Sequence, residues 1–295
     1  MSISVQPANT NSQQPYHLGL PMWSNRDWLG SLYPAGSDSQ TFLQHYSSVF
    51  NAVEGNTTFY ALPSEQTVSS WALQAQPGFK FCFKLPRSVT HIGRLQSSQQ
   101  LTDYFKRLEP LGDFLGPFMV QLPADVGGDA LSNIKQFLAQ LPTAFQFSLE
   151  VRSPDFFLKD EVEKRLNQLL IAAGVDRVCF DSRALFSLTA KTAAEKAAQK
   201  QKPNLPVHAI ATANKPIVRF IGTKDANYND YYLQSWLPKI SQWCAEGRRP
   251  YLFVHTPANE VAPYHAQLLH QKLAGLPNWQ PLVKTIQAKQ QITLF

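Results

Sequence analysis

The stretch Ala52-Val53-Glu54-Gly55-Asn56 runs from apolar residues directly into a carboxylate and an amide, and Leu149-Glu150-Val151-Arg152 repeats the pattern. Eight short apolar runs follow one another along the chain, and most of them end in a polar or charged side chain. The segments between them have helical periodicity, so the sequence predicts strands that alternate with helices. The runs are 16–23, 52–60, 79–86, 118–123, 145–152, 177–183, 217–222 and 250–257.

Eight such strands and their helices in 295 residues predict an α/β fold, a single (β/α)8 TIM-type barrel with eight parallel strands. We expect a flexible N-terminal segment at 1–15, the barrel domain at 16–280 and a C-terminal tail at 281–295. An extended connection follows the sixth strand. Its Ala- and Lys-rich part, 189–202, favours a helix with little apolar surface, and it is either a mobile lid or a solvated excursion.

Composition limits the class of protein. A hydrophobic fraction of 44% supports one large core, and no run approaches the length of a membrane span, so we expect a soluble protein without a membrane partner. The three cysteines are widely spaced in apolar surroundings, as is typical of reduced residues in the cytoplasm. The net charge of +6 helps an anionic partner to approach, but this mild excess does not establish nucleic-acid binding. The oligomeric state stays open.

Polar side chains gather where the predicted strands end, which is the functional end of a barrel of this kind. Side chains alternate along a strand, so Glu54 and Asn56 face one side, as do Glu150 and Arg152. Any single member is as readily explained as part of a buried ion pair. The catalytic candidates are Glu54, Lys84, His91, Glu150 and Asp181, and the substrate-binding candidates are Trp23, Asn56, Tyr60, Gln121, Arg152, Arg219 and His255.

Such a ring of mixed charge is suited to binding a phosphate or a carboxylate. A carboxylate or His91 would act as general base, and Lys84 or an arginine would stabilise developing negative charge. A Schiff-base role for Lys84 is disfavoured, because neighbouring carboxylates would raise its pKa. We expect Glu150→Gln, Lys84→Met and Arg219→Met to keep the fold and to abolish ligand binding.

The sequence contains no strong motif for a metal or another cofactor. Neither a His-x-His pair nor a His-Glu-x-x-His motif occurs, so no metal is assigned and no cofactor is evident. One magnesium or manganese ion held by Glu150 and Asp181 remains an alternative. Gly222-Thr223 would offer backbone donors to a phosphate, a weak signal.

Several motifs together resemble domain of unknown function 72, over about residues 16–273. They are Gly19 with Trp23, Asp27-Trp28, Tyr33-Pro34, the segment from Phe50 to Tyr60, Trp71, Phe79 to Pro86 with Thr90-His91, and Glu150-Val151-Arg152. The resemblance implies a TIM-type barrel and no established activity. It directs attention to Glu54, Asn56, Lys84, His91, Glu150, Arg152, Asp181 and Arg219. The chain departs from the expected pattern near Ala258, where an acidic or amide residue is expected, and this puts any role of that loop in doubt.

The last five residues resemble the pentapeptide by which bacterial replication and repair proteins dock on the DNA sliding clamp. Gln291, Leu294 and Phe295 are the partner-binding candidates. The alternative is that these residues pack back on the barrel. Docking would place apolar anchors in a partner's groove.

Three functions remain open. The first, which we favour from sequence, is an enzyme acting on a phosphate-bearing, plausibly nucleic-acid-related substrate. The second is an enzyme for an anionic small metabolite such as a sugar acid or sugar phosphate. The third is a non-catalytic binding module that recruits a partner through its tail. A deep pocket closed by the lysine-rich connection favours a small ligand, whereas an open basic groove favours a polymer.

Overall fold

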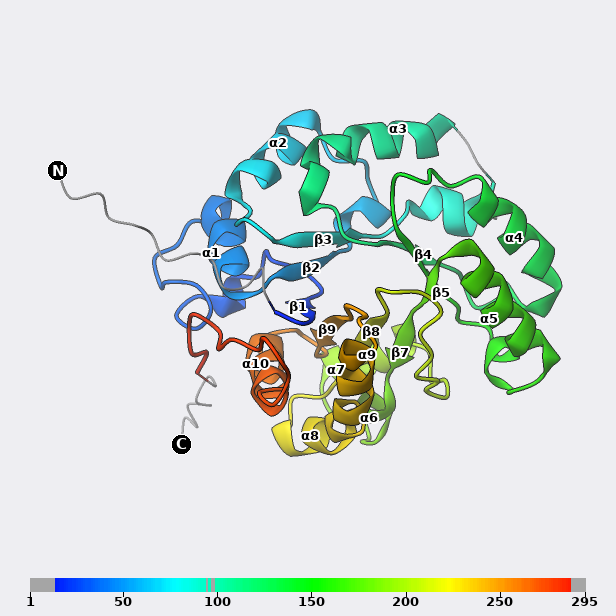
Figure 1. Cartoon of the computed structure of the whole chain (residues 1–295). Coiled ribbons are helices and arrows are strands. Elements are labelled where there is room, and N and C mark those ends of the chain that lie inside the picture. The colour runs from blue at the N-terminus through cyan, green and yellow to red at the C-terminus, as the bar shows by residue number, and fades with distance from the viewer. Residues whose placement is uncertain (1–13, 94, 97–98, 288–295) are drawn as a thin grey trace.

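The computed structural model describes residues 14–93, 95–96 and 99–287. Parallel strands lie in the middle and helices surround them (Figure 1). The strands are β1 (His17–Leu20), β2 (Ala52–Gly55), β3 (Lys80–Phe83), β4 (Phe118–Gln121), β5 (Phe147–Glu150), β6 (Asp176–Arg177), β7 (Cys179–Asp181), β8 (Ile217–Ile221) and β9 (Tyr251–His255). The helices are α1 (Phe42–Val49), α2 (Glu65–Gln74), α3 (Gln99–Leu108), α4 (Leu131–Ala139), α5 (Glu161–Ala173), α6 (Arg183–Phe186), α7 (Ala193–Gln201), α8 (Ala226–Gln234), α9 (Leu237–Ala245) and α10 (Ala262–Lys272).

The strands form two sheets, with the order β3-β2-β1-β9-β8-β7 in one and β4-β5-β6 in the other. The predicted alternation of parallel strands and helices is confirmed, but the predicted eight-stranded ring is not one continuous ladder. Between β3 and β4, the bridges Phe81 to Leu115 and Lys84 to Met119 leave one extra residue on the second strand. Pro117 lies in this stretch and lacks an N–H, so the ladder is interrupted there.

The second interruption divides the sixth predicted strand into β6 and β7. β6 pairs with β5, whereas β7 pairs with β8, and Val178 lies between the two halves. The Val178 N–H still donates to the Leu149 carbonyl at 2.9 Å. The sheets therefore meet at both edges, and the fold is barrel-like.

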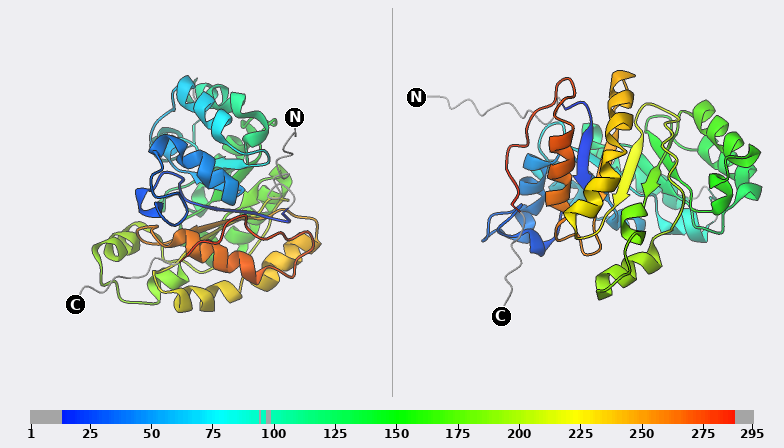
Figure 2. Two further views of the ribbon diagram at one scale, coloured as in Figure 1. Left: turned by 90° about the vertical axis from the view of Figure 1, so that its left-hand side faces the viewer. Right: turned by 90° about the horizontal axis from the view of Figure 1, so that it is seen from below.

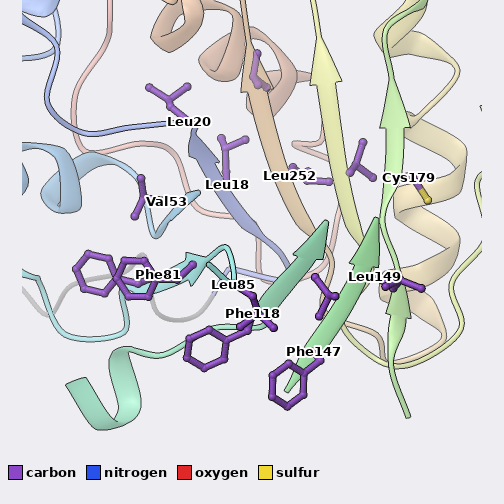
Figure 3. Close-up of a cluster of buried hydrophobic side chains, with 14 of the residues drawn as sticks. Leu18, Leu20, Val53, Phe81, Leu85, Phe118, Phe147, Leu149, Cys179 and Leu252 are labelled. Atoms are coloured by element: carbon purple, nitrogen blue, oxygen red, sulfur yellow. The ribbon is translucent and has the colours of Figure 1, made fainter. Parts of the chain in front are cut away.

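Side chains on alternate strand positions fill two separate regions. An outer cluster packs between the strands and the helices, and Figure 3 shows Leu18, Leu20, Val53 and Leu252 of β1, β2 and β9 among its members. An inner apolar layer lies between the strands themselves. It consists of Ala52, Cys82, Met119, Val178, Ile217, Tyr251 and Phe253.

The helices are positioned by local capping and by their apolar faces. Ser64 Oγ accepts from the Thr67 N–H at 3.1 Å and caps the start of α2. Figure 2 shows α1 to α3 on one side of the strands and α8 to α10 on the opposite side. Among the described residues, no helix combines the length and apolar character needed to cross a membrane.

The extended connection after the sixth strand contains α6 and α7 and is fastened to the strand ends. A capping box between Thr192 and Glu195 begins α7. Ser182 Oγ, directly after β7, donates to the Pro203 carbonyl at 2.7 Å. The end of α7 is thereby held beside the carboxyl ends of the strands.

The structure describes part of each predicted terminal segment, namely residues 14–15 of the first and 281–287 of the second. Gln14 is buried, and its Oε1 accepts from the Gln280 N–H at 3.1 Å. Ile286 is also buried, and its N–H donates to Gln267 Oε1. Residues 1–13 and 288–295 lie outside the described part, and with them Gln291, Leu294 and Phe295.

Candidate functional site

A polar layer lies directly above the inner apolar layer, toward the carboxyl ends of the strands. All but one of its members follow a residue of the inner apolar layer by two positions, and Glu150 follows the buried Ser148 instead. Strand alternation therefore points them inward as well. Glu54 follows Ala52, for example, and Arg219 follows Ile217. The members are Glu54, Lys84, Gln121, Glu150, Arg219 and His255, and Phe180 fills the corresponding position of β7.

Arg219 joins the two glutamates of this layer. Its Nε and Nη2 donate to both oxygens of Glu54 at 2.7 Å, and its Nη1 donates to Glu150 Oε2 at 2.5 Å. All three side chains are almost completely buried. The Arg219 guanidinium also lies 5.3 Å from the centre of the Phe180 ring. This double ion pair holds β2, β5 and β8 together.

A second group of donors converges on Gln121. Lys84 Nζ and Arg152 Nη2 each donate to Gln121 Oε1 at 2.9 Å. Arg152 Nε also donates to Glu150 Oε1 at 2.8 Å, and Lys84 Nζ lies 3.6 Å from Glu54 Oε1. Among the described residues, Gln121 Nε2 has no acceptor of its own, so its two N–H groups are available to a ligand.

Asn56 and His255 complete the surroundings of Glu54. Asn56 Nδ2 donates to Glu54 Oε1 at 2.9 Å, and His255 Nε2 lies 3.0 Å from Glu54 Oε2. Burial lowers the pKa of His255 to about 4, against the opposing effect of Glu54. The neutral imidazole therefore places its proton on Nε2, where it donates to Glu54.

Both carboxylates stay ionised. Burial alone would raise the pKa of Glu54, but Arg219, His255 and Lys84 together hold it well below its usual value. The pKa of Glu150 falls to about 2, since Arg219 and Arg152 outweigh its burial. The cations bound by each carboxylate lie between it and the cavity. The two glutamates are therefore better placed to position Arg219 than to exchange a proton with a substrate.

For the two lysines of the cavity, a lowered pKa favours the neutral form instead of the charged one. Burial and the charge of Arg219 lower the pKa of Lys84 to about 7, although Glu54 and Glu150 act against the shift. The carboxylates do raise this pKa, as expected, but burial and Arg219 outweigh them, so the ground for disfavouring a Schiff-base role does not hold. Burial and Arg219 also lower the pKa of Lys202, at the end of α7, to about 8.

A cavity of about 500 Å³ opens above the polar layer. Five cationic side chains line it, and among its described lining residues there is no carboxylate. The lining consists of Pro21, Met22, Asn56, Phe59, Tyr60, Lys84, Arg87, His91, Gln121, Arg152, Gln201, Lys202, Arg219, His255 and Asn259. The two arginines of the polar network balance the two glutamates, so the remaining positive charge of the lining comes from Lys84, Arg87 and Lys202.

Aromatic side chains form the rim of the cavity. His91 lies on a single π-helical turn, Ser88–Ile92, a feature that often occurs at functional sites. Its ring meets that of Phe59 edge-on, with 5.1 Å between their centres, and its Nδ1 lies 2.9 Å from Thr90 Oγ1. Burial and the nearby Arg152 lower the pKa of His91. Tyr60 is exposed beside them.

Asp181 is not brought into this group. Phe180 occupies the inward position of β7, so Asp181 points outward toward α9. Its carboxylate accepts from Trp236 Nε1 at 2.7 Å and from Arg183 Nη2 at 2.8 Å. A strand end alone does not reveal which of two successive side chains faces inward.

Trp23 and Gly222-Thr223 also lie outside the cavity lining. The Trp23 ring packs edge-on against Trp71 and Phe81, with centres 5.3 Å and 5.8 Å apart. The Gly222 N–H donates to the His255 carbonyl, and the Thr223 N–H donates to Asn229 Oδ1. Both backbone donors are used within the protein, so they do not form the expected phosphate site.

The sequence did not point to Lys202, Gln201 or Phe180 as site residues. The long connection was recognised as a candidate lid, but its amino-acid pattern gave no sign of which residue would reach the cavity. Within the described ranges, no cluster of three or more His, Cys, Asp or Glu side chains is placed to hold a metal ion. Glu150 and Asp181 face opposite sides of the strands, so they do not form a shared site.

Fold and cavity together define a barrel-like α/β protein with a cation-lined pocket at the carboxyl ends of its parallel strands. A family model described as "Protein of unknown function DUF72" matches residues 17–290, and the chain belongs to this family. The UPF0759 protein YecE of Escherichia coli strain K12 is 39% identical over 281 residues, which cover 95% of this chain and 99% of YecE. The resemblance seen in the sequence is confirmed.

Two solved structures share the fold. A DUF72 family protein from Thermotoga maritima MSB8 has a TM-score of 0.65 and 20% identity, covering 88% of this chain and 98% of that one. A DUF72 family protein from Enterococcus faecalis V583 has a TM-score of 0.63 and 16% identity, covering 92% and 100%. These similarities establish the architecture and carry no activity with them.

Proposed function

We propose that the protein is an enzyme that binds a small anionic metabolite in this cavity. The observation that carries the proposal is the lining, in which five cationic side chains face the space while both carboxylates are covered by Arg219 and Arg152. An anion supplies further acceptors for these cations and an acceptor for Gln121 Nε2. The neutral imidazoles of His91 and His255 and the amine of Lys84 supply groups for proton transfer.

The cavity favours a small ligand over a polymer. Lys202 and Gln201 of the extended connection contribute to its wall, and its volume of about 500 Å³ is that of a metabolite site. A nucleic-acid substrate, favoured from the sequence, would need a longer basic groove. Docking on a sliding clamp through Gln291, Leu294 and Phe295 stays a prediction, because these residues lie outside the described part.

Arg152→Met tests the binding site directly. Its removal takes away a charged donor at the cavity wall but leaves the ion pair between Arg219 and the glutamates. We expect the affinity for a bound anion to fall by about tenfold to hundredfold, the usual value of a charge-assisted hydrogen bond. Isothermal titration would measure it, after a thermal-shift screen of sugar phosphates, sugar acids, oxo acids, hydroxy acids and nucleoside monophosphates.

Lys200→Met is the matched control. Lys200 lies on the exposed side of α7, two residues before Lys202, and carries the same charge outside the lining. This variant should keep nearly the full affinity. Equal losses in both variants would show that overall charge, rather than the cavity, attracts the anion, and the absence of any binder in the screen would refute the proposed function.

Anion binding should be coupled to proton uptake. An anion stabilises the protonated forms of Lys84 and Lys202, whose pKa values in the empty cavity are about 7 and about 8. Affinity is then highest below about pH 7, falls by up to about tenfold per unit between pH 7 and pH 8, and by up to about hundredfold per unit above pH 8, where both lysines lose their protons. Sulfate is a suitable probe, because it has no pKa near neutrality.

Titrations in buffers of different ionisation enthalpy would count the protons taken up. Lys84→Met should remove the part of the pH dependence near pH 7 and leave the part near pH 8. An affinity for sulfate that stays constant from pH 6 to pH 9 would contradict this coupling.

A further inference from the structure

Lys84 is held as a rigid amine rather than a free surface cation. The hydroxyls of Thr58 and Tyr104 donate to its main-chain carbonyl at 2.9 Å and 3.0 Å, which fixes the backbone at the end of β3. Its Nζ donates to Gln121 Oε1 and still reaches the cavity, which Lys84 lines. The side chain is only 8% exposed, so solvent access is through the cavity.

A strong anion donor lies beside this amine. Arg152 Nη2 and Lys84 Nζ share one acceptor, Gln121 Oε1, at 2.9 Å each. The two nitrogens are therefore no further than about 6 Å apart. In a 2-oxo acid the carbonyl carbon is bonded directly to the carboxylate carbon. A carboxylate bound by Arg152 accordingly brings that carbonyl carbon next to Lys84 Nζ.

From this geometry we propose that Lys84 forms an imine with the carbonyl carbon of a small 2-oxo acid whose carboxylate is bound by Arg152. This inference rests on the proposed function and names its substrate class. Lys84 Nζ attacks the carbonyl carbon, and the C=O π electrons pass to oxygen to give a carbinolamine. The C–O bond then breaks and a C=N bond forms. The two amine hydrogens and the carbonyl oxygen leave as water, so no oxidant or reductant is consumed.

The surroundings support each stage of this reaction. In the empty cavity, a pKa of about 7 leaves roughly half of Lys84 as the neutral nucleophile at neutral pH. Protonation of the imine nitrogen from solvent places a positive charge where the ammonium was, and Glu54 Oε1 lies 3.6 Å from that position. The imidazole of His91 lines the same cavity, and in its neutral form it can accept the proton that the amine loses when it attacks.

Reductive trapping tests the proposal. The full-length protein is incubated with pyruvate or 2-oxoglutarate and sodium cyanoborohydride, and its intact mass and peptides are then measured. One reduced adduct per chain should form and map to Lys84 in the unmodified protein. Lys84→Arg should lower adduct formation by at least about tenfold, the loss expected for a reactive nucleophile. Lys200→Met, which removes an exposed lysine of α7 outside the cavity lining, should keep it.

Lactate and 2-hydroxyglutarate are matched controls that have the carboxylates but lack the carbonyl. If they bind and the oxo acids give no adduct at Lys84, the imine is refuted while anion binding stands. If neither oxo acids nor hydroxy acids bind and no adduct forms, both proposals fall. Adducts spread over many lysines, or unchanged in Lys84→Arg, would also overturn the imine. Because peptide mapping locates the adduct in the unmodified protein, the test does not depend on the variants folding.

Discussion

Arg219→Met is expected to lower the free energy of unfolding by about 3–5 kcal/mol or more, which is much of the stability of an ordinary domain. The guanidinium binds both oxygens of Glu54 and one oxygen of Glu150 in a completely buried setting. Its loss leaves two ionised carboxylates without their main partner. This reverses the expectation from sequence that the variant keeps its fold. Urea denaturation would measure the change.

The triple variant Arg219→Met, Glu54→Gln, Glu150→Gln provides the internal control. Removing both charges together with their partner should recover much of the lost stability, because no uncompensated buried charge remains. Lys164→Met provides the surface control, since its pair with Glu161 is exposed and should contribute less than about 1 kcal/mol. An Arg219→Met protein as stable as the unmodified chain would show that the buried ion pairs are not needed for folding.

Gly19→Ala is expected to cost more than about 3 kcal/mol, at the upper end of single-substitution effects. A Cβ at Gly19 would lie 2.0 Å from the Ala52 carbonyl oxygen, so β1 and β2 would have to part. The Tyr46 hydroxyl bridges the strands at this point, accepting from the Leu20 N–H and donating to the Ala52 carbonyl. A thermal melt of the purified variant is sufficient to measure the loss.

Gly36→Ala is the matched substitution for this test. A Cβ at Gly36 would meet no atom within 4 Å, and its backbone lies outside the left-handed region. This variant should melt within a few degrees of the unmodified protein. Equal melting temperatures for Gly19→Ala and Gly36→Ala would mean that β1 and β2 separate without cost at this point.

Strand alternation made much of the site predictable from sequence. Glu54 and Glu150 end short apolar runs, and the structure places both inward with Arg219 and His255. The same rule failed at Asp181, because Val178 and Phe180 form one apolar face of that run and Cys179 the other. With both faces apolar, the pattern does not decide which one turns inward.

The electrostatics could not be predicted, because they depend on three-dimensional burial. Lys84 has carboxylates nearby, as the sequence predicts, yet its pKa falls because burial and the charge of Arg219 outweigh them. Lys202 is distant from the other site residues in sequence, and its place depends on how the connection is fastened at Ser182. The pKa of Lys84 and the position of Lys202 depend on distances and burial in the folded protein, which cannot be read from the order of the residues.

The inner apolar layer has a consequence for how molecules enter and leave. Its seven side chains are all buried and close the barrel interior beneath the charged network. Within the described part of the chain, this layer leaves the cavity no outlet toward the amino ends of the strands. A ligand therefore enters and leaves on the side of the carboxyl ends, where Tyr60, His91 and Lys202 line the cavity. Under the proposed function, substrate and product would use this same side, so bound product would exclude substrate and inhibit competitively.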